Sequence, residues 1–234
     1  MSRTPGSDGA RTEQLIRKTA IELIAKHGFE AMTLRQLAAQ VGIQPGSVYR
    51  YFPSKGKLLA QLQIEHLEFL LERWNEETQS LGCSVLTQLE DFVDFHIRYH
   101  TLRRQEVFVA NMELRSLEPE DYKQVVCLRR RYEKILQNIL LEGVSEGLFR
   151  IGKLNRSAPT SVTSRAGVRP SEIMATSFAL LAMLTGVGTW FNESGRMAKQ
   201  DLIILYTQLV FQSLGVALSE NGRVGTSGVL LEHA

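Results

Sequence analysis

Residues 45–52 carry side chains whose types and spacing suit recognition of another molecule. If the segment is helical, Val48 and Phe52 lie four residues apart on its inner side. Its outer side then presents a hydroxyl, an aromatic ring and a guanidinium group, from Ser47, Tyr49 and Arg50. Groups of this kind contact base edges and phosphates in the major groove of DNA. The segment therefore predicts a helix that reads duplex DNA.

A second short helix precedes this segment and would hold it in place. Its apolar positions follow the spacing i, i+3, i+4, i+7 and are Leu34, Leu37, Ala38 and Val41. Thr33 stands at the N-cap position with Gln36 three residues on, and Gly42 suits the positive φ of a helix end. Pro45 fits the first position of the following helix. Two short helices joined by a tight glycine turn predict a helix-turn-helix.

Two longer helices are predicted around this pair. The first, at 12–27, braces it from behind. The second is capped by Ser54, runs to about residue 80 and carries two lysines in its first turn, a good clamp for a phosphate. Residues 12–58 are thus predicted to form a three-helix DNA-binding domain, and the polar arm at 1–11 is predicted to be flexible.

The stretch 42–59, GIQPGSVYRYFPSKGKLL, resembles the signature of TetR-type transcriptional repressors. That signature reads roughly G-V-S-x-G-T-L-Y-x-Y/H-F-x-S-K-E-x-L. The chain departs from it at Gln44-Pro45, Ser47 and Gly56, and none of these changes removes a DNA-facing group. The resemblance implies an all-α fold with an N-terminal three-helix helix-turn-helix DNA-binding domain. A C-terminal helical domain at 59–218 would then bind ligand and form the dimer.

The resemblance also implies how the protein works. A dimer would bind a palindromic operator in double-stranded DNA and repress transcription until a small hydrophobic effector releases it. Residues 96–100, 113–117 and 143–149 resemble the subgroup that senses acyl-coenzyme A thioesters in lipid or sterol breakdown, so an acyl-CoA is the expected effector. The alternatives are a drug-sensing repressor of an efflux gene and a DNA-binding regulator without a ligand.

Eleven residues are expected to contact DNA. Ser47 and Arg50 approach base edges, Arg50 at a guanine. The others lie at the mouth of the groove or hold phosphates: Gln44, Pro45, Gly46, Thr33, Arg35, Tyr49, Tyr51, Lys55 and Lys57. The charge distribution agrees, because residues 1–60 hold nine Lys or Arg against four acids, whereas the rest of the chain holds 18 against 21.

Helical periodicity continues along the rest of the chain, and no strand is predicted. The expected helices are 84–102, 103–116, 119 to about 143–147, 171–192 and 198–216. Residues 152–170 interrupt the pattern and are expected to form a mobile loop, and 219–234 a flexible tail. The last helix is apolar on too many sides for one chain to cover. It predicts a homodimer in which two helices from each chain pack at a two-fold axis.

Aromatic and soft side chains recur in the middle helices and are expected to line a pocket for the effector. They are Phe92, Phe95, His96, Tyr99, His100, Phe108, Met112, Met183 and Trp190. Taken singly, each also fits an ordinary packed core. His96 and His100 lie four apart, either as two metal ligands or as polar groups beside a cavity or interface. No third ligand is marked in the sequence, which favours the second interpretation and no metal.

No motif in the sequence predicts an enzyme or a bound cofactor. Residues 143–147 match the pattern G-x-S-x-G, which supplies a nucleophile only on a strand-to-helix turn. Here the pattern falls at the end of a predicted helix. The pair Gly186 and Gly188 lacks the third glycine and the preceding strand of a dinucleotide site.

Composition favours a soluble cytoplasmic protein. The two cysteines, Cys83 and Cys127, make no disulfide framework, and the first eleven residues are polar. Residues 173–191 form the one uncharged, membrane-like stretch. Because it contains several Thr, Ser and Gly and lacks flanking basic clusters, it is interpreted as a buried helix that touches protein on nearly all faces.

Overall fold

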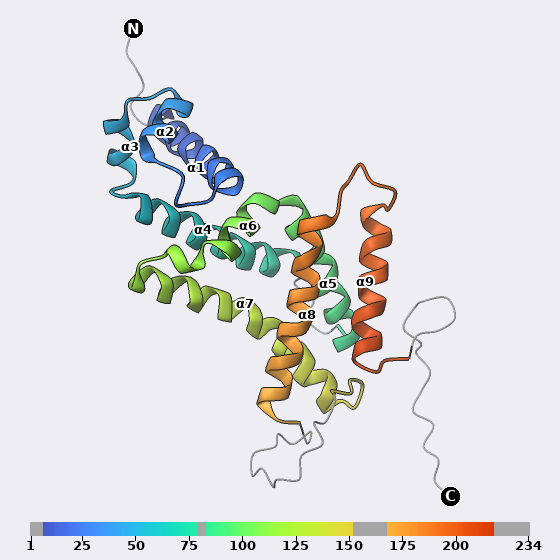
Figure 1. The fold of residues 1–234 in the computed structure, drawn as a ribbon. Coiled ribbons are helices and arrows are strands. Elements are labelled where there is room, and N and C mark those ends of the chain that lie inside the picture. Colours follow the sequence, from blue (N-terminus) through green and yellow to red (C-terminus); the bar gives the residue numbers. More distant parts are fainter. Residues whose placement is uncertain (1–6, 79–82, 152–167, 218–234) are drawn as a thin grey trace, which may run out of the picture. The chain divides into compact units, whose positions relative to one another are not determined.

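The computed structural model describes residues 7–78, 83–151 and 168–217. The predicted tail at 219–234 and most of the loop predicted at 152–170 lie outside these ranges. Within them the chain is all-α, with nine α-helices, one short 3₁₀ helix and no strand (Figure 1), which confirms the predicted fold class. The helices are α1 (Ser7–His27), α2 (Leu34–Val41), α3 (Pro45–Tyr51), α4 (Lys55–Glu77), α5 (Val85–Leu102), α6 (Arg104–Met112), η1 (Leu114–Ser116), α7 (Pro119–Ser145), α8 (Pro170–Trp190) and α9 (Lys199–Ser213).

The chain divides into two compact units. The first comprises 1–76 and 102–131, and the second comprises 77–101 and 132–234. These units differ from the division expected at residues 58 and 59. The physical reason is that the core around the helix-turn-helix also contains apolar residues of α4 and α6, namely Leu58, Leu59, Leu62 and Val109.

Helix α1 begins earlier than predicted. Residues 7–11, expected in a flexible arm, form its first turns. Residues 1–6 lie outside the described part of the chain. The inner face of α1 carries Ile16, Ala20 and Ile24, each fully buried in a core that also contains residues of α2 and α3. Cooperative propagation of helical hydrogen bonds beyond this anchored stretch accounts for the extra turns.

The predicted helix at 103–116 is interrupted. It forms α6 and then the short turn η1, and Glu113 between them is not α-helical. The Glu113 carboxylate instead accepts a hydrogen bond from the Phe29 backbone N–H at 2.9 Å. A tertiary contact therefore shapes this segment, and periodicity alone does not reveal it.

Helix α8 shows why apolar composition differs from burial. Its residues Ile173, Ser177, Leu180, Leu184 and Val187 form one buried stripe in the second unit. By length and hydropathy α8 could cross a membrane, and 28% of its most apolar 18 residues are buried inside the protein. The prediction that residues 173–191 touch protein on nearly all faces is thus wrong for the single chain, because only one stripe of α8 is covered.

Candidate functional site

The helix-turn-helix has the capping geometry that its sequence predicts. The Thr33 side chain accepts a hydrogen bond from the Gln36 backbone N–H at 3.1 Å and caps α2. Gly42 ends α2 with a φ of 78°, the left-handed conformation in which a Cβ would be strained. Pro45 opens α3. These local interactions fix how α3 leaves the turn.

Helix α3 has one buried and one exposed side. Val48 and Phe52 are both fully buried in the core of the first unit. Tyr49 is 55% exposed, Arg50 is exposed and Ser47 is partly buried. The outward groups predicted from the sequence are therefore presented to solvent by the packing of the opposite face.

Two arginines of the helix-turn-helix have no hydrogen-bond or ion-pair partner among the described residues. They are Arg35 on α2 and Arg50 on α3, and both are exposed. Arg17 on α1 differs, because its guanidinium group pairs with Glu13 at 2.6 Å and with Glu65 at 2.7 Å. Arg35 and Arg50 are thus exposed cations of the helix-turn-helix that are available to an external anion.

The two lysines of the first turn of α4 have partners within the first unit. Lys55 Nζ donates to the Phe29 carbonyl at 2.9 Å and lies 4.2 Å from the centre of the Phe29 ring. Lys57 Nζ lies 2.8 Å from each carboxylate oxygen of Asp121, at the start of α7. Both lysines therefore stabilise the fold, a role that the sequence did not reveal.

A second interaction that sequence reasoning missed joins the segment after α6 to the DNA-binding helices. Glu113 Oε1 accepts from the Phe29 N–H, and Glu113 Oε2 accepts from the Ser116 hydroxyl at 3.0 Å. Phe29 is 5% exposed and belongs to the same core as Val48. Leu117 packs against that core as well. No local sequence signal marks this pairing across 84 residues.

The second unit contains a buried polar cluster at the predicted histidines. His96 Nδ1 lies 3.1 Å from the Tyr132 hydroxyl, and His96 Nε2 lies 3.1 Å from the Thr185 hydroxyl. The rings of His96 and His100 stack with centres 3.7 Å apart, and His100 Nδ1 donates to the His96 carbonyl at 2.8 Å. No group of three or more candidate metal ligands occurs in the described ranges. This geometry is that of polar groups in a packed interior.

Burial alters the proton affinity of this cluster. Desolvation, and secondarily the neighbouring His100, lowers the pKa of His96 well below its usual value. Desolvation also raises the pKa of Tyr132 well above its usual value, with Tyr99 as the second cause. Both residues are therefore neutral at physiological pH.

The nine residues predicted to line one pocket do not all lie in one unit. Phe92, Phe95, His96, Tyr99 and His100 on α5 are buried in the second unit, and Met183 on α8 is partly buried there. Trp190, also in the second unit, is 55% exposed. Phe108 and Met112 lie on α6 in the first unit and are 40% and 54% exposed. Helical period does not specify which amphipathic helix packs on which.

Helix α4 contains a buried amide that was not predicted from the sequence. Gln63 is 1% exposed, and neither its amide oxygen nor its amide nitrogen has a hydrogen-bond partner among the described residues. Gln63 lies four residues from Leu59 and from Leu67, both buried, so it stands within an apolar stripe. A polar residue within an apolar stripe is the feature of the sequence from which this site could have been predicted. An unpaired buried amide is costly and points to a missing polar partner.

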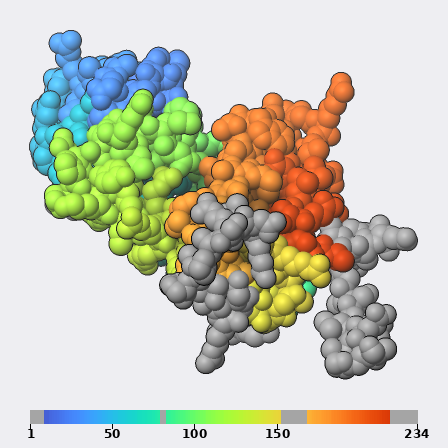
Figure 2. All heavy atoms as spheres, turned by 60° about the horizontal axis from the view of Figure 1, so that its bottom comes forward, coloured from blue at the N-terminus to red at the C-terminus, as the bar shows by residue number. Residues whose placement is uncertain are grey.

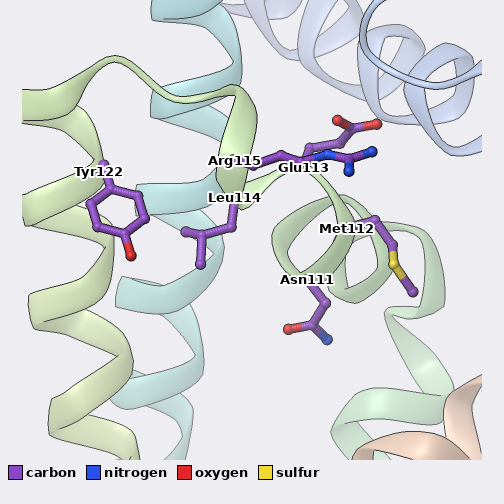
Figure 3. Close-up of a pocket in the computed structure, with 6 residues that line it drawn as sticks. All are labelled: Asn111, Met112, Glu113, Leu114, Arg115 and Tyr122. Carbon is purple, nitrogen blue, oxygen red and sulfur yellow. The ribbon is translucent and has the colours of Figure 1, made fainter.

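The first unit has an open pocket of about 460 Å³ at the end of α6 (Figure 3). Its lining residues come from α6, η1, the residue between them and the start of α7, and are Asn111, Met112, Glu113, Leu114, Arg115 and Tyr122. Of the residues predicted to bind ligand, it includes only Met112. Glu113, Leu114 and Arg115 lie in the segment 113–117, which resembles the acyl-CoA-sensing subgroup, and were not predicted as pocket residues.

The G-x-S-x-G pattern has a structural explanation. Ser145 is the last residue of α7, and its hydroxyl donates to the Leu141 carbonyl at 2.8 Å. A Cβ on Gly143 would come within 2.1 Å of the Phe149 ring, so this glycine makes room for a buried aromatic side chain. The pattern lies at the end of a helix rather than on a strand-to-helix turn, so it lacks the geometry that a nucleophile needs.

Helices α8 and α9 expose large apolar side chains in the second unit. The two helices run side by side, joined by residues 191–198 (Figure 1), and their side chains form a continuous stretch of surface, orange and red in Figure 2. The exposed residues are Met174, Phe178, Trp190, Met197, Ile204, Leu205 and Leu209, each 40–55% exposed. Large apolar side chains exposed along neighbouring helices are typical of an interaction site.

Two known protein-family models match parts of this chain. The family model described as "Bacterial regulatory proteins, tetR family" matches residues 16–62, which include the helix-turn-helix. The model described as "Tetracyclin repressor-like, C-terminal domain" matches residues 82–159. Together the two models cover more than half of the chain, and both describe regulatory proteins rather than an enzyme.

The individual relatives share a low sequence identity with this chain. The fatty acid metabolism regulator protein of Bacillus subtilis (strain 168) is 26% identical over 133 residues, which cover 57% of this chain and 68% of that protein. The HTH-type transcriptional repressor KstR2 of Mycolicibacterium smegmatis is 28% identical over 150 residues, covering 63% and 71%. The crystal structure of AibR in complex with isovaleryl coenzyme A and operator DNA superposes with a TM-score of 0.70 at 18% identity, covering 86% of this chain and 98% of that one. At 18% identity, the similarity to AibR shows a shared fold alone.

Proposed function

Because the chain belongs to the tetR family of bacterial regulatory proteins, we propose that it represses transcription as an operator-bound dimer that a hydrophobic effector releases. The observation that carries the proposal is the two-sided helix α3. Its inner residues are fully buried, and its outer residues are exposed polar groups on a helix that is capped and fixed. A pre-organised helix of this kind suits insertion into a major groove in the cytoplasm, where operator DNA lies.

Arg50 supplies base recognition in this proposal. Its guanidinium group has no partner among the described residues, so pairing with a guanine costs no internal ion pair. Ser47 contacts the neighbouring base edge, and Gln44, Pro45 and Gly46 line the mouth of the groove. The phosphate contacts come from Thr33, Arg35, Tyr49, Tyr51, Lys55 and Lys57. The two lysines use their remaining N–H groups for phosphate, since an ammonium group has three donors.

The exposed apolar surface of α8 and α9 supports the dimer. A second copy of this chain would cover the side chains that the single chain leaves 40–55% exposed. Packing two helices from each chain at a two-fold axis gives each α3 the same relation to its half of a palindrome. Dimerisation therefore doubles the contact with DNA.

We propose an acyl-CoA thioester as the effector. The names of two relatives, a fatty acid regulator and KstR2, and the structure of AibR with isovaleryl coenzyme A support this class of ligand. Within this chain, the unpaired amide of Gln63 supplies a buried hydrogen-bonding group for a polar atom of the ligand. Leu58 and Leu59 of α4 belong to the core of the helix-turn-helix, so a shift of α4 on binding reaches α3.

The proposal is tested by gel shift with the DNA upstream of the chain's own gene and of neighbouring genes. The dimer should bind one palindromic fragment, and a series of acyl-CoA thioesters should include at least one that releases it. Gln63→Leu should keep operator affinity and weaken the response to that thioester. Release by none of the thioesters overturns the acyl-CoA assignment, and absence of binding to any fragment at low ionic strength overturns the DNA-binding assignment.

A further inference from the structure

We propose that the pocket in the first unit, lined by Asn111, Met112, Glu113, Leu114, Arg115 and Tyr122, binds a small amphipathic carboxylate and transmits its presence to the DNA-binding helices. This site is separate from the Gln63 contact assigned above. Its effect on operator affinity rests on the proposed DNA binding, whereas the binding of a carboxylate to the pocket does not.

The size and walls of the pocket suit a short acyl chain. Its volume of about 460 Å³ falls within the range of small-molecule sites. Met112 is 54% exposed and Tyr122 is 44% exposed, so both keep apolar surface in contact with solvent. The Tyr122 ring faces Leu114, and the Arg115 side chain reaches toward Met112 (Figure 3). Covering these apolar surfaces with a hydrocarbon chain is favourable.

The hydrogen-bonding groups of the pocket select an anion. The Arg115 guanidinium and the Tyr122 hydroxyl have no partner among the described residues. Asn111 Oδ1 accepts from Arg129 at 2.9 Å, which leaves the amide nitrogen of Asn111 as a donor without a partner in the same ranges. Three donors therefore stand unpaired around one pocket.

The one acid in the pocket is held by hydrogen bonds within the first unit. Both Glu113 oxygens already accept hydrogen bonds, from the Phe29 N–H at 2.9 Å and from the Ser116 hydroxyl at 3.0 Å. Each Glu113 oxygen thus has an internal partner that holds the carboxylate in place, and the unpaired groups of the pocket are the donors of Asn111, Arg115 and Tyr122. A guanidinium group binds a carboxylate through two parallel hydrogen bonds, which makes Arg115 the anchor for the ligand's head group.

The pocket is one hydrogen bond from the DNA-binding core. Glu113 lines the pocket and also binds the backbone of Phe29, which lies in the connection between α1 and α2. The Phe29 carbonyl in turn accepts from Lys55, at the start of α4. A ligand that moves the segment 111–115 therefore changes the interactions of Phe29, and with them the support of α2.

Calorimetric titration of the full-length protein with octanoate tests the ligand. Wild type should bind octanoate, whereas acetate, which lacks the chain, and 1-octanol, which lacks the charge, should bind at least tenfold more weakly. Arg115→Met should weaken octanoate binding at least tenfold, and Tyr122→Phe about threefold. Arg130→Met, which removes an exposed arginine of α7 outside the pocket, should bind like wild type. Equal binding by Arg115→Met and wild type, or no binding by wild type, overturns the proposal.

Hydrogen exchange at the Phe29 amide tests the transmission without DNA. Saturating octanoate should change the exchange rate of this amide at least threefold in wild type and leave it unchanged in Arg115→Met. An unchanged rate in wild type overturns the coupling even if octanoate binds. If octanoate binds and alters Phe29 but leaves operator affinity within twofold, the regulatory part of the proposal is wrong. Failure of the protein to bind any DNA contradicts the proposed function alone.

Discussion

Arg50 is the residue on which sequence-specific recognition depends in the proposed function. It stands on the exposed side of α3, opposite the fully buried Val48, and has no partner among the described residues. Removal of its side chain therefore leaves the core and the internal ion pairs of the first unit unchanged.

The first prediction is that Arg50→Ala weakens operator binding by about 1–3 kcal/mol, because a bidentate contact with a guanine is lost. Helical content, measured by circular dichroism, should stay the same. Arg35→Ala provides the comparison, since loss of a phosphate contact should weaken operator and non-specific DNA alike and reduce the salt dependence. If Arg50→Ala binds the operator with wild-type affinity in a gel shift, Arg50 does not contact the bases.

His96 supports a prediction about acid stability. Its pKa is lowered in the folded protein by burial and by His100 on its own helix, while Tyr132 of α7 and Thr185 of α8 occupy its ring nitrogens. Below a pH of about 6.5 the unfolded chain binds a proton that the folded chain does not. Acidification therefore favours unfolding, and this loss of stability continues until the pH falls below the pKa of folded His96.

The second prediction is that the free energy of unfolding falls by up to about 1.4 kcal/mol per pH unit as the pH drops below about 6.5. In His96→Gln this slope should be smaller, because the titrating group is gone. His27→Gln, which removes an exposed histidine, should keep the wild-type slope. Urea unfolding at pH 7.5 and 5.5 measures the difference. Identical slopes in wild type and His96→Gln would show that His96 is not the group responsible.

At the scale of elements, the turn between α2 and α3 sets the direction of α3. Gly42 has a φ of 78°, and no atom lies within 4 Å of the position that its Cβ would take. The cost of a side chain there is therefore backbone strain alone. Gly46, inside α3, has equally open surroundings and a φ outside the left-handed region.

The third prediction compares these two glycines. Gly42→Ala should lower the free energy of unfolding by about 1 kcal/mol, because alanine is strained at positive φ. Gly46→Ala should leave it unchanged or raise it by up to about 1 kcal/mol, since alanine favours a helix. Urea unfolding of the two variants checks the pair. Equal stability of both variants would mean that the turn adjusts without strain.

At the scale of the whole molecule, the proposed dimer depends on the apolar surface of α8 and α9. Ile204 and Leu205 are 48% and 40% exposed on α9, beside a buried stripe that contains Leu202 and Val210. A protein that kept this surface in water would tend to associate non-specifically. Pairing with a second copy gives the surface one defined partner.

The fourth prediction is that Ile204→Glu raises the dimer dissociation constant at least tenfold, because it places an unpaired charge in an apolar interface. Gln200→Glu, in the exposed first turn of the same helix, should dimerise like wild type. Analytical ultracentrifugation measures both. Operator affinity should fall together with dimerisation, and a dimeric Ile204→Glu that binds DNA normally would place the interface elsewhere.

The sequence by itself determined the helix-turn-helix, down to the Thr33 cap, the Gly42 turn and the outward face of α3. Each of these features depends on residues within a few positions of one another, where capping, backbone conformation and helical period act. The tertiary structure alone decided that Glu113 binds Phe29, that Phe108 and Met112 lie in a different unit from Phe92, and that α8 buries a single stripe. Several amphipathic helices of similar composition can pack in many ways, and only the full set of side-chain contacts selects one.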